Sequence, residues 1–120
     1  MVTVIYSARD RVQLTMRGHA GAGAKGQDLV CAACSILAYA FAQTALDLWQ
    51  EGALQEEPEL CMAPGDSEIS MLPRDKRAQE AVRGILAGYR LLSKNWPECV
   101  RFLCAEGGFH PRGEGGTLGT

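Results

Sequence analysis

The sequence predicts a single α+β domain in which long helices pack on one sheet of about five strands. Short β-branched or alternating segments come in two pairs, and a long helical segment follows each pair. One more short strand completes the order ββαββαβ. A chain of 120 residues can build one such core but not two ordinary ones. Hairpins alternating with helices are typical of helices layered on a sheet.

The first pair of segments predicts a hairpin. Residues 2–6 form a β-branched and aromatic run, and residues 11–17 alternate between apolar and polar side chains. The apolar members of the second segment are Val12, Leu14 and Met16. This alternation indicates a half-buried strand that pairs with the first.

The segment 29–51 predicts the central helix. Asp28 is a good N-cap residue, and Gly52 is typical of the position just after a helix. Residues 29–46 carry no charge, which is close to the lower length limit for a membrane-spanning helix. Alanines and polar residues dilute this run, so we expect a core helix and no membrane partner.

The second half of the chain repeats the rhythm of a hairpin and a helix. Pro64-Gly65-Asp66 is strong turn chemistry between two short strands. Within the second helix, Gly84 and Gly88 weaken the helix but allow a neighbour to approach closely. The glycine-rich end of the chain, residues 107–120, is expected to be a disordered tail on a domain of residues 1–106. The other predicted elements are strands 58–62, 68–72 and 98–105 and a helix over 75–95.

Charge and cysteine content narrow the class of protein. A net charge of −2 offers no basic field for phosphates, so direct nucleic-acid binding is not expected. The N-terminus lacks the pattern of a secretory signal, and five cysteines are an odd number for a disulfide-stapled domain. The cytoplasm is the expected location. Between Asp47 and Glu68 stand seven acidic residues and no basic one, which predicts a solvated face or a surface that attracts a basic peptide.

The residues that suggest chemistry are Cys31 and His19. Cys31 is expected at about the third position of the central helix, where unpaired N–H groups and the helix dipole stabilise a thiolate. The same N–H groups could hold an oxyanion. His19 lies at the end of a strand and could serve as the base. A buried cysteine and a surface histidine with no catalytic role are the alternative interpretation.

Between the histidine and the cysteine lies a segment of small residues, which we expect to be a mobile loop over the site. Asp28 could cap the helix, orient His19, or do both. The glycines of the predicted substrate loop are Gly18, Gly21, Gly23 and Gly26.

Cys31 and Cys34 also form a CxxC pair, the spacing used by thiol–disulfide oxidoreductases. The flanking residues and the order of strands do not match a thioredoxin. A zinc site would need a second suitable pair, and Cys99 with Cys104 has poor spacing, so no metal and no other cofactor is expected.

The motifs GHA, GxDLVCAA and SxL, spread over residues 18–37, resemble the ribosomal-processing cysteine protease Prp family. The resemblance in length and element order covers nearly the whole chain except the tail. It implies removal of a short N-terminal extension from a large-subunit ribosomal protein, with Cys31 as nucleophile and His19 as base. Asp28 matches an acidic position of the motif.

The resemblance further implies a homodimer. Cys34 departs from it, because an aliphatic residue is usual at that position. Two other functions stay open from the sequence. One is a redox protein that uses Cys31 and Cys34, and the other is a ribosome-assembly factor that binds the ribosomal protein without cleaving it.

Overall fold

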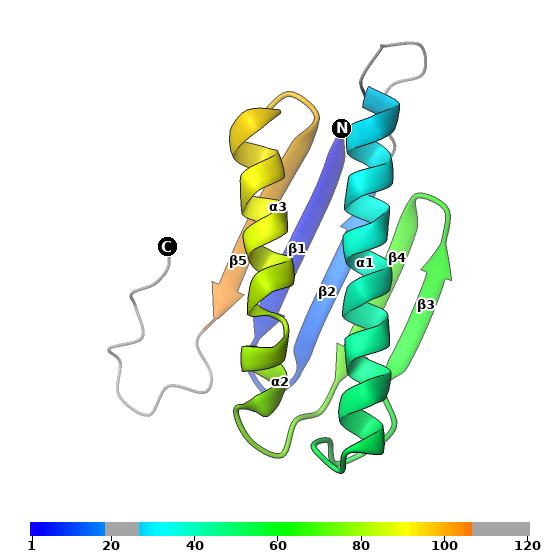
Figure 1. Ribbon diagram of the computed structural model, residues 1–120, viewed down its shortest axis with the longest axis vertical. Helices are drawn as coiled ribbons and strands as arrows, with labels where there is room; N and C mark the ends of the chain where they lie inside the picture. Colours follow the sequence, from blue (N-terminus) through cyan, green and yellow to red (C-terminus); the bar gives the residue numbers. More distant parts are fainter. Residues whose placement is uncertain (19–26, 107–120) are drawn as a thin grey trace.

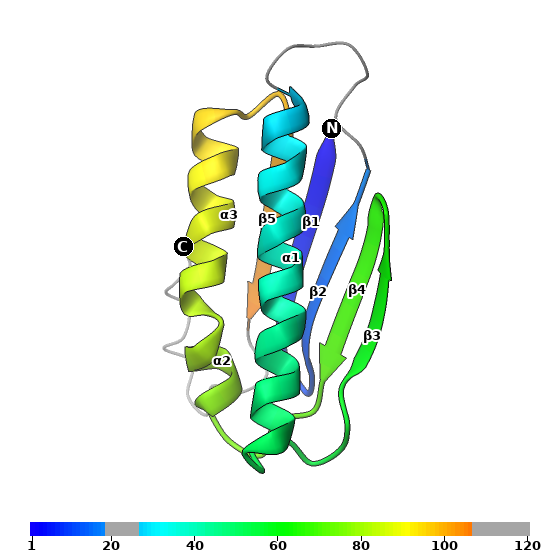
Figure 2. The same cartoon turned by 45° about the vertical axis from the view of Figure 1, so that its right-hand side comes forward.

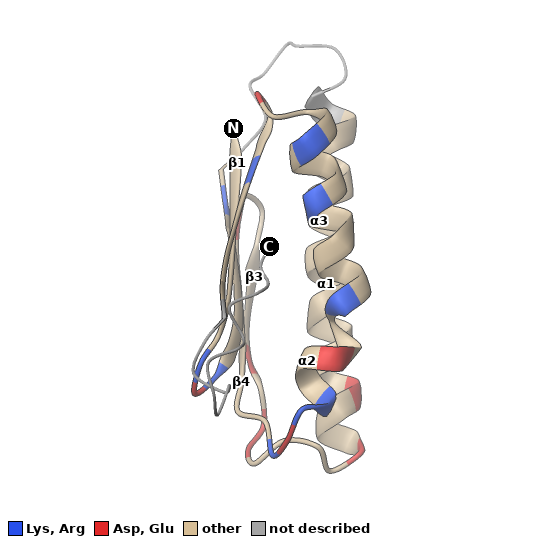
Figure 3. Cartoon of the chain, turned by 90° about the vertical axis from the view of Figure 1, so that its left-hand side faces the viewer, with Lys and Arg blue, Asp and Glu red and all other residues tan. Residues whose placement is uncertain are grey.

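The computed structural model describes residues 1–18 and 27–106, which form two layers (Figure 1). One layer is a five-stranded sheet and the other consists of helices, all on the same face of the sheet (Figure 3). This arrangement confirms the predicted α+β class. The segment 19–26 and the predicted tail 107–120 lie outside the described residues, so the expectations for a loop and a tail stay predictions.

The sheet joins two hairpins and adds a fifth strand at one edge. Its order is β3-β4-β2-β1-β5, and every pair is antiparallel except β1 with β5. Both predicted hairpins are confirmed, since β1 pairs with β2 and β3 pairs with β4. The second helical segment joins β4 to β5 and takes the chain to the far edge of the sheet, where β5 lies parallel to β1. The strands are β1 Val2–Ala8, β2 Val12–Arg17, β3 Glu59–Ala63, β4 Asp66–Met71 and β5 Val100–Glu106.

Alternation in the strands builds the core. On β1 and β2, every second side chain is fully buried toward the helices, and Tyr6 lies opposite Leu14 across the pair. The rings of Tyr6 and of Phe41, which comes from the central helix, form a T-shaped pair with their centroids 6.3 Å apart. If the pairing of β1 with β2 shifted by one residue, the buried side chains of the shifted strand would all point to the opposite face of the sheet.

The central helix α1, Gln27–Gln50, runs the length of the sheet (Figure 2). It begins two residues earlier than predicted, which places Asp28 inside its first turn. The capping role of Asp28 stays a prediction, because its side chain lies outside the described residues.

One face of α1 packs on the sheet through side chains such as Phe41, and the opposite face is open to solvent. Leu29–Gln50 is long and apolar enough to cross a membrane by length and composition alone, a test that the core helix of a soluble protein also passes. The predicted core helix is therefore confirmed for one face only.

The predicted second helix is two helices, α2 Arg77–Ala81 and α3 Arg83–Asn95. The break falls at Val82, whose backbone has φ −97° and ψ 2° and whose side chain is fully buried. A β-branched residue followed two positions later by Gly84 weakens the helix at this point.

The close approach predicted at the two glycines occurs at only one of them. A Cβ on Gly88 would lie 3.0 Å from Leu37 of α1, whereas a Cβ on Gly84 would meet nothing within 4 Å. Gly88 therefore lets α3 pack tightly against α1, and the expectation for Gly84 is wrong.

Candidate active site

Cys31 is the fifth residue of α1 and lies half-buried against the core. The earlier start of the helix moves it two positions further in than expected. Side chains on a helix tilt toward its N-terminus, so the Cys31 side chain leans toward the first turn. The N–H groups of that turn have no partner within the helix. This position can still offer donors to an anion at the sulfur.

Gly18 determines where the chain leaves β2. Its N–H donates to the carbonyl of Gly65 at 2.9 Å, and its φ is +105°. A Cβ on Gly18 would collide with the carbonyl oxygen of Met1. Only glycine fits this position. The residue therefore has a structural role at the end of the sheet where α1 begins (Figures 1 and 2).

Several predicted site residues cannot be placed relative to Cys31. His19 follows Gly18 directly, but it lies outside the described residues, as do Gly21, Gly23 and Gly26. The side chain of Asp28 is also outside them. The pairing of His19 with Cys31 and the role of Asp28 stay predictions.

All five cysteines lie in the described ranges, and their surroundings differ. Cys34 is fully buried one turn after Cys31, and Cys99 is 5% exposed before β5. Burial, followed by the charges of Cys31 and Cys99, raises the pKa of the Cys34 thiol from 9.0 to about 11. Cys61 and Cys104 are exposed on strands. Cys31 is thus the only cysteine that is both accessible and close to the start of a helix.

Tyr89 of α3 connects α1 to β5 close to Cys31. Its buried hydroxyl donates to the backbone carbonyl of Cys34 at 2.9 Å, and its ring stacks on Phe102 of β5 with centroids 5.8 Å apart. Burial is the main cause of its raised pKa, so the phenol stays protonated and can donate. Tyr89 was not among the site residues predicted from the sequence. A buried tyrosine needs a hydrogen-bond partner for its hydroxyl, and this need was the only feature of the sequence that could have indicated a contact of Tyr89 with a neighbouring element.

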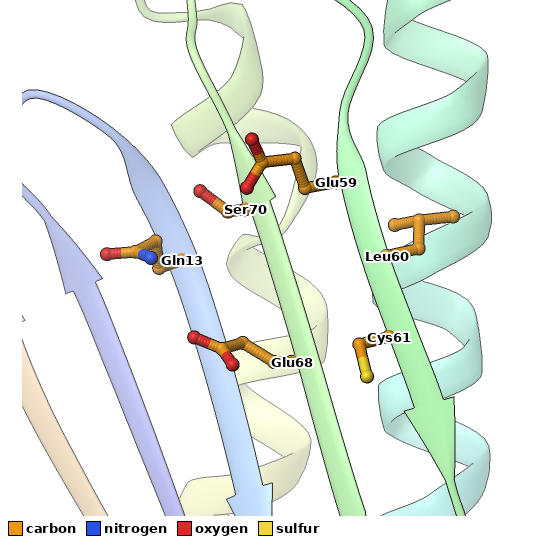
Figure 4. A pocket seen from close by; sticks show the side chains of 6 residues that line it. All are labelled: Gln13, Glu59, Leu60, Cys61, Glu68 and Ser70. Carbon is orange, nitrogen blue, oxygen red and sulfur yellow. The ribbon is translucent and has the colours of Figure 1, made fainter.

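A shallow hollow of about 170 Å³ lies on the other face of the sheet, across β2, β4 and β3 (Figure 4). Ser70 at its floor is buried, and its hydroxyl accepts a hydrogen bond from Nε of Arg11 at 2.6 Å. Because α1 covers the opposite face, this hollow is separate from Cys31. The residues that line it are Gln13, Glu59, Leu60, Cys61, Glu68 and Ser70.

The acidic stretch is solvated, since all seven of its carboxylate side chains are exposed. Arg17 pairs with two of them, Asp66 at 3.1 Å and Glu68 at 3.9 Å. Within residues 1–18 and 27–106, no three histidine, cysteine or acidic side chains are arranged to hold a metal ion.

Comparison with known proteins identifies related sequences and folds. A family model described as cysteine protease Prp matches residues 1–101. The crystal structure of SMU.848 from Streptococcus mutans has a TM-score of 0.63 at 24% identity, covering 89% of this chain and 96% of that one.

The ribosomal processing protease Prp from S. aureus gives two further matches. In complex with a substrate peptide it has a TM-score of 0.63, and with a covalently linked product peptide 0.61. Both are 24% identical and cover 87% of this chain and 99% of that one. No curated protein sequence matches the chain.

Proposed function

Because the chain belongs to the cysteine protease Prp family and is a cysteine protease, we propose that it trims a short N-terminal extension from a large-subunit ribosomal protein. The observation that carries this proposal is the position of Cys31, half-buried near the start of α1 at the end of the sheet where β2 ends. The S. aureus protein of similar fold, described as a ribosomal processing protease, supports the class of substrate.

In the proposed reaction, the imidazole of His19 takes the proton from Cys31 and the thiolate attacks the scissile carbonyl. N–H groups of the first turn of α1 donate to the oxyanion that forms. His19 then protonates the leaving amine, and water hydrolyses the thioester. Asp28 orients His19 in this scheme. No cofactor takes part.

We expect an extended basic peptide as the substrate. The exposed carboxylates on β3 and β4 attract such a chain over a distance, an effect that salt weakens. The glycine-rich segment that begins at Gly18 would admit the peptide to Cys31. A cytoplasmic location fits this substrate, and no contact with nucleic acid is needed.

We further propose a homodimer formed through the N-terminal half of α1. Its solvent face is apolar over three turns, with Leu29 77%, Ile36 63% and Tyr39 57% exposed. Further along the same face come Gln43 and Asp47, which hydrogen-bond to each other at 2.9 Å. A contiguous apolar surface beside a polar one is typical of a protein–protein interface. A second copy would cover it.

The test is cleavage of a synthetic peptide that spans the expected extension, followed by mass spectrometry. Cys31→Ala and His19→Ala should each lower kcat by roughly 10³-fold or more while the protein stays folded. The control is Cys61→Ala, which removes an exposed thiol from β3 and should leave kcat unchanged. A peptide that binds but is never cleaved would instead indicate a ribosome-assembly factor. If the protein instead catalyses thiol–disulfide exchange, and this activity is lost in Cys34→Val but not in His19→Ala, it is a redox protein.

A further inference from the structure

Three thiols gather where α1 begins and β5 approaches. Cys31 is half-buried and packs against the core, Cys34 is fully buried, and Cys99 is 5% exposed. Cys34 and Cys99 belong to the same hydrophobic core, Cys31 packs against that core, and Cys31 and Cys34 are three residues apart in α1. Cleavage of a peptide needs only one of these sulfurs.

Helix geometry brings Cys31 and Cys34 within reach of a disulfide. Residues three apart in an α-helix have Cα atoms about 5 Å apart. Disulfides span Cα separations of roughly 4.4–6.8 Å. The Cβ atoms of such residues are about 5–6 Å apart, which is longer than the roughly 3.8 Å of a relaxed disulfide. The helix must tighten locally to close the bond, and strain of this kind makes a disulfide easy to reduce.

We propose that Cys34 is the resolving thiol for Cys31, so that oxidation by a peroxide is captured as a Cys31–Cys34 disulfide that reversibly switches the protease off. The inference rests on the proposed role of Cys31 as nucleophile. The Cys31 thiolate attacks one oxygen of the peroxide, breaking the O–O bond to give a sulfenic acid and releasing the other oxygen as water or an alcohol. The Cys34 sulfur then attacks the sulfenic sulfur, and its proton leaves with the hydroxyl as water. Two electrons pass from the pair of thiols to the peroxide.

Burial gives Cys34 a selective role. A neutral thiol in the core does not compete with Cys31 for a peptide or for peroxide, because the thiolate is the reactive form. It reacts with the sulfenic sulfur of Cys31 because the two side chains lie one turn apart in α1, and the departing hydroxyl takes the proton of Cys34. Without Cys34, a sulfenic acid at Cys31 can be oxidised further to a sulfinic acid, which thiols do not reduce.

The experiment treats the fully reduced full-length protein with hydrogen peroxide and maps the cysteines under non-reducing conditions by mass spectrometry. The wild type should lose both Cys31 and Cys34 to alkylation without gaining oxygen. Its peptidase activity should return after a dithiol reductant is added. Cys34→Ala should instead accumulate a sulfinic acid at Cys31 and stay inactive after reduction. Cys61→Ala should behave as the wild type.

Other outcomes overturn the proposal. A disulfide between Cys31 and Cys99, sulfinic acid on Cys31 in the wild type, or full recovery of Cys34→Ala would each refute the role of Cys34. If Cys34→Ala does not fold, Cys34→Val replaces it. The mapping does not depend on activity, so it separates failure of the switch from failure of the proposed catalysis.

Discussion

Replacing Gly18 with alanine should destabilise the fold and lower activity, because two costs meet at this residue. Alanine at a φ of +105° is strained by about 1–2 kcal/mol. The new Cβ would also strike the carbonyl oxygen of Met1, and crowding of this kind adds about 1–3 kcal/mol. The matched control is Gly52→Ala, because Gly52 has a φ of +78° but open space around its Cβ.

The expected melting temperatures follow from the chain length. A domain of 120 residues loses about 4 °C per kcal/mol. Gly18→Ala should therefore lower Tm by about 8–20 °C, and Gly52→Ala by about 4–8 °C. Thermal unfolding followed by circular dichroism measures both. Equal shifts in the two variants would refute the collision with Met1.

Activity gives a second measurement on the same two variants. Below both melting temperatures, Gly18→Ala should have a lower kcat/KM because the displaced backbone leads directly into His19. Gly52→Ala should keep the wild-type value. If neither variant changes kcat/KM, Gly18 has no influence on the site.

Three further predictions concern α1 and its neighbours. Ile36→Glu should convert a dimer into a monomer in sedimentation velocity while Tm changes little, and an unchanged dimer would place the interface elsewhere. Tyr89→Phe should lower the free energy of unfolding by about 1 kcal/mol in urea unfolding, because the hydrogen bond from the hydroxyl to the Cys34 carbonyl is lost. An unchanged free energy of unfolding would show that this hydrogen bond makes no net contribution to stability. The free energy of unfolding should fall as pH rises from about 9 to about 11, because the unfolded Cys34 thiol ionises there while the folded one, with its pKa near 11, keeps its proton. Cys34→Ala should show a smaller fall, and an identical fall would contradict the raised pKa.

Local pattern predicted the elements of this fold better than it predicted their ends. The alternation around Leu14 was sufficient for a strand, because a half-buried strand requires that period. The break at Val82 was not visible, since the apolar period continues through it. The start of α1 was predicted two residues too late, because Asp28 suits an N-cap by its own propensity, whereas the helix begins at Gln27.

Long-range contacts account for what the sequence could not show. Nothing local specifies that β5 lies beside β1, or that the Tyr89 hydroxyl reaches the carbonyl of Cys34. For the site, the motif identified Cys31, and the structure confirms that it is accessible near a helix start. The tight fit of Gly18 against Met1 depends on two chain segments meeting, so the sequence predicted only a loop there.

The most direct test of the central claim is the fate of the extension peptide incubated with wild type, Cys31→Ala and Cys61→Ala. Mass spectrometry should find one new N-terminus with the wild type and with Cys61→Ala, and intact peptide with Cys31→Ala. Circular dichroism should show the same fold in all three. Cleavage by a folded Cys31→Ala protein would contradict the claim that Cys31 is the nucleophile.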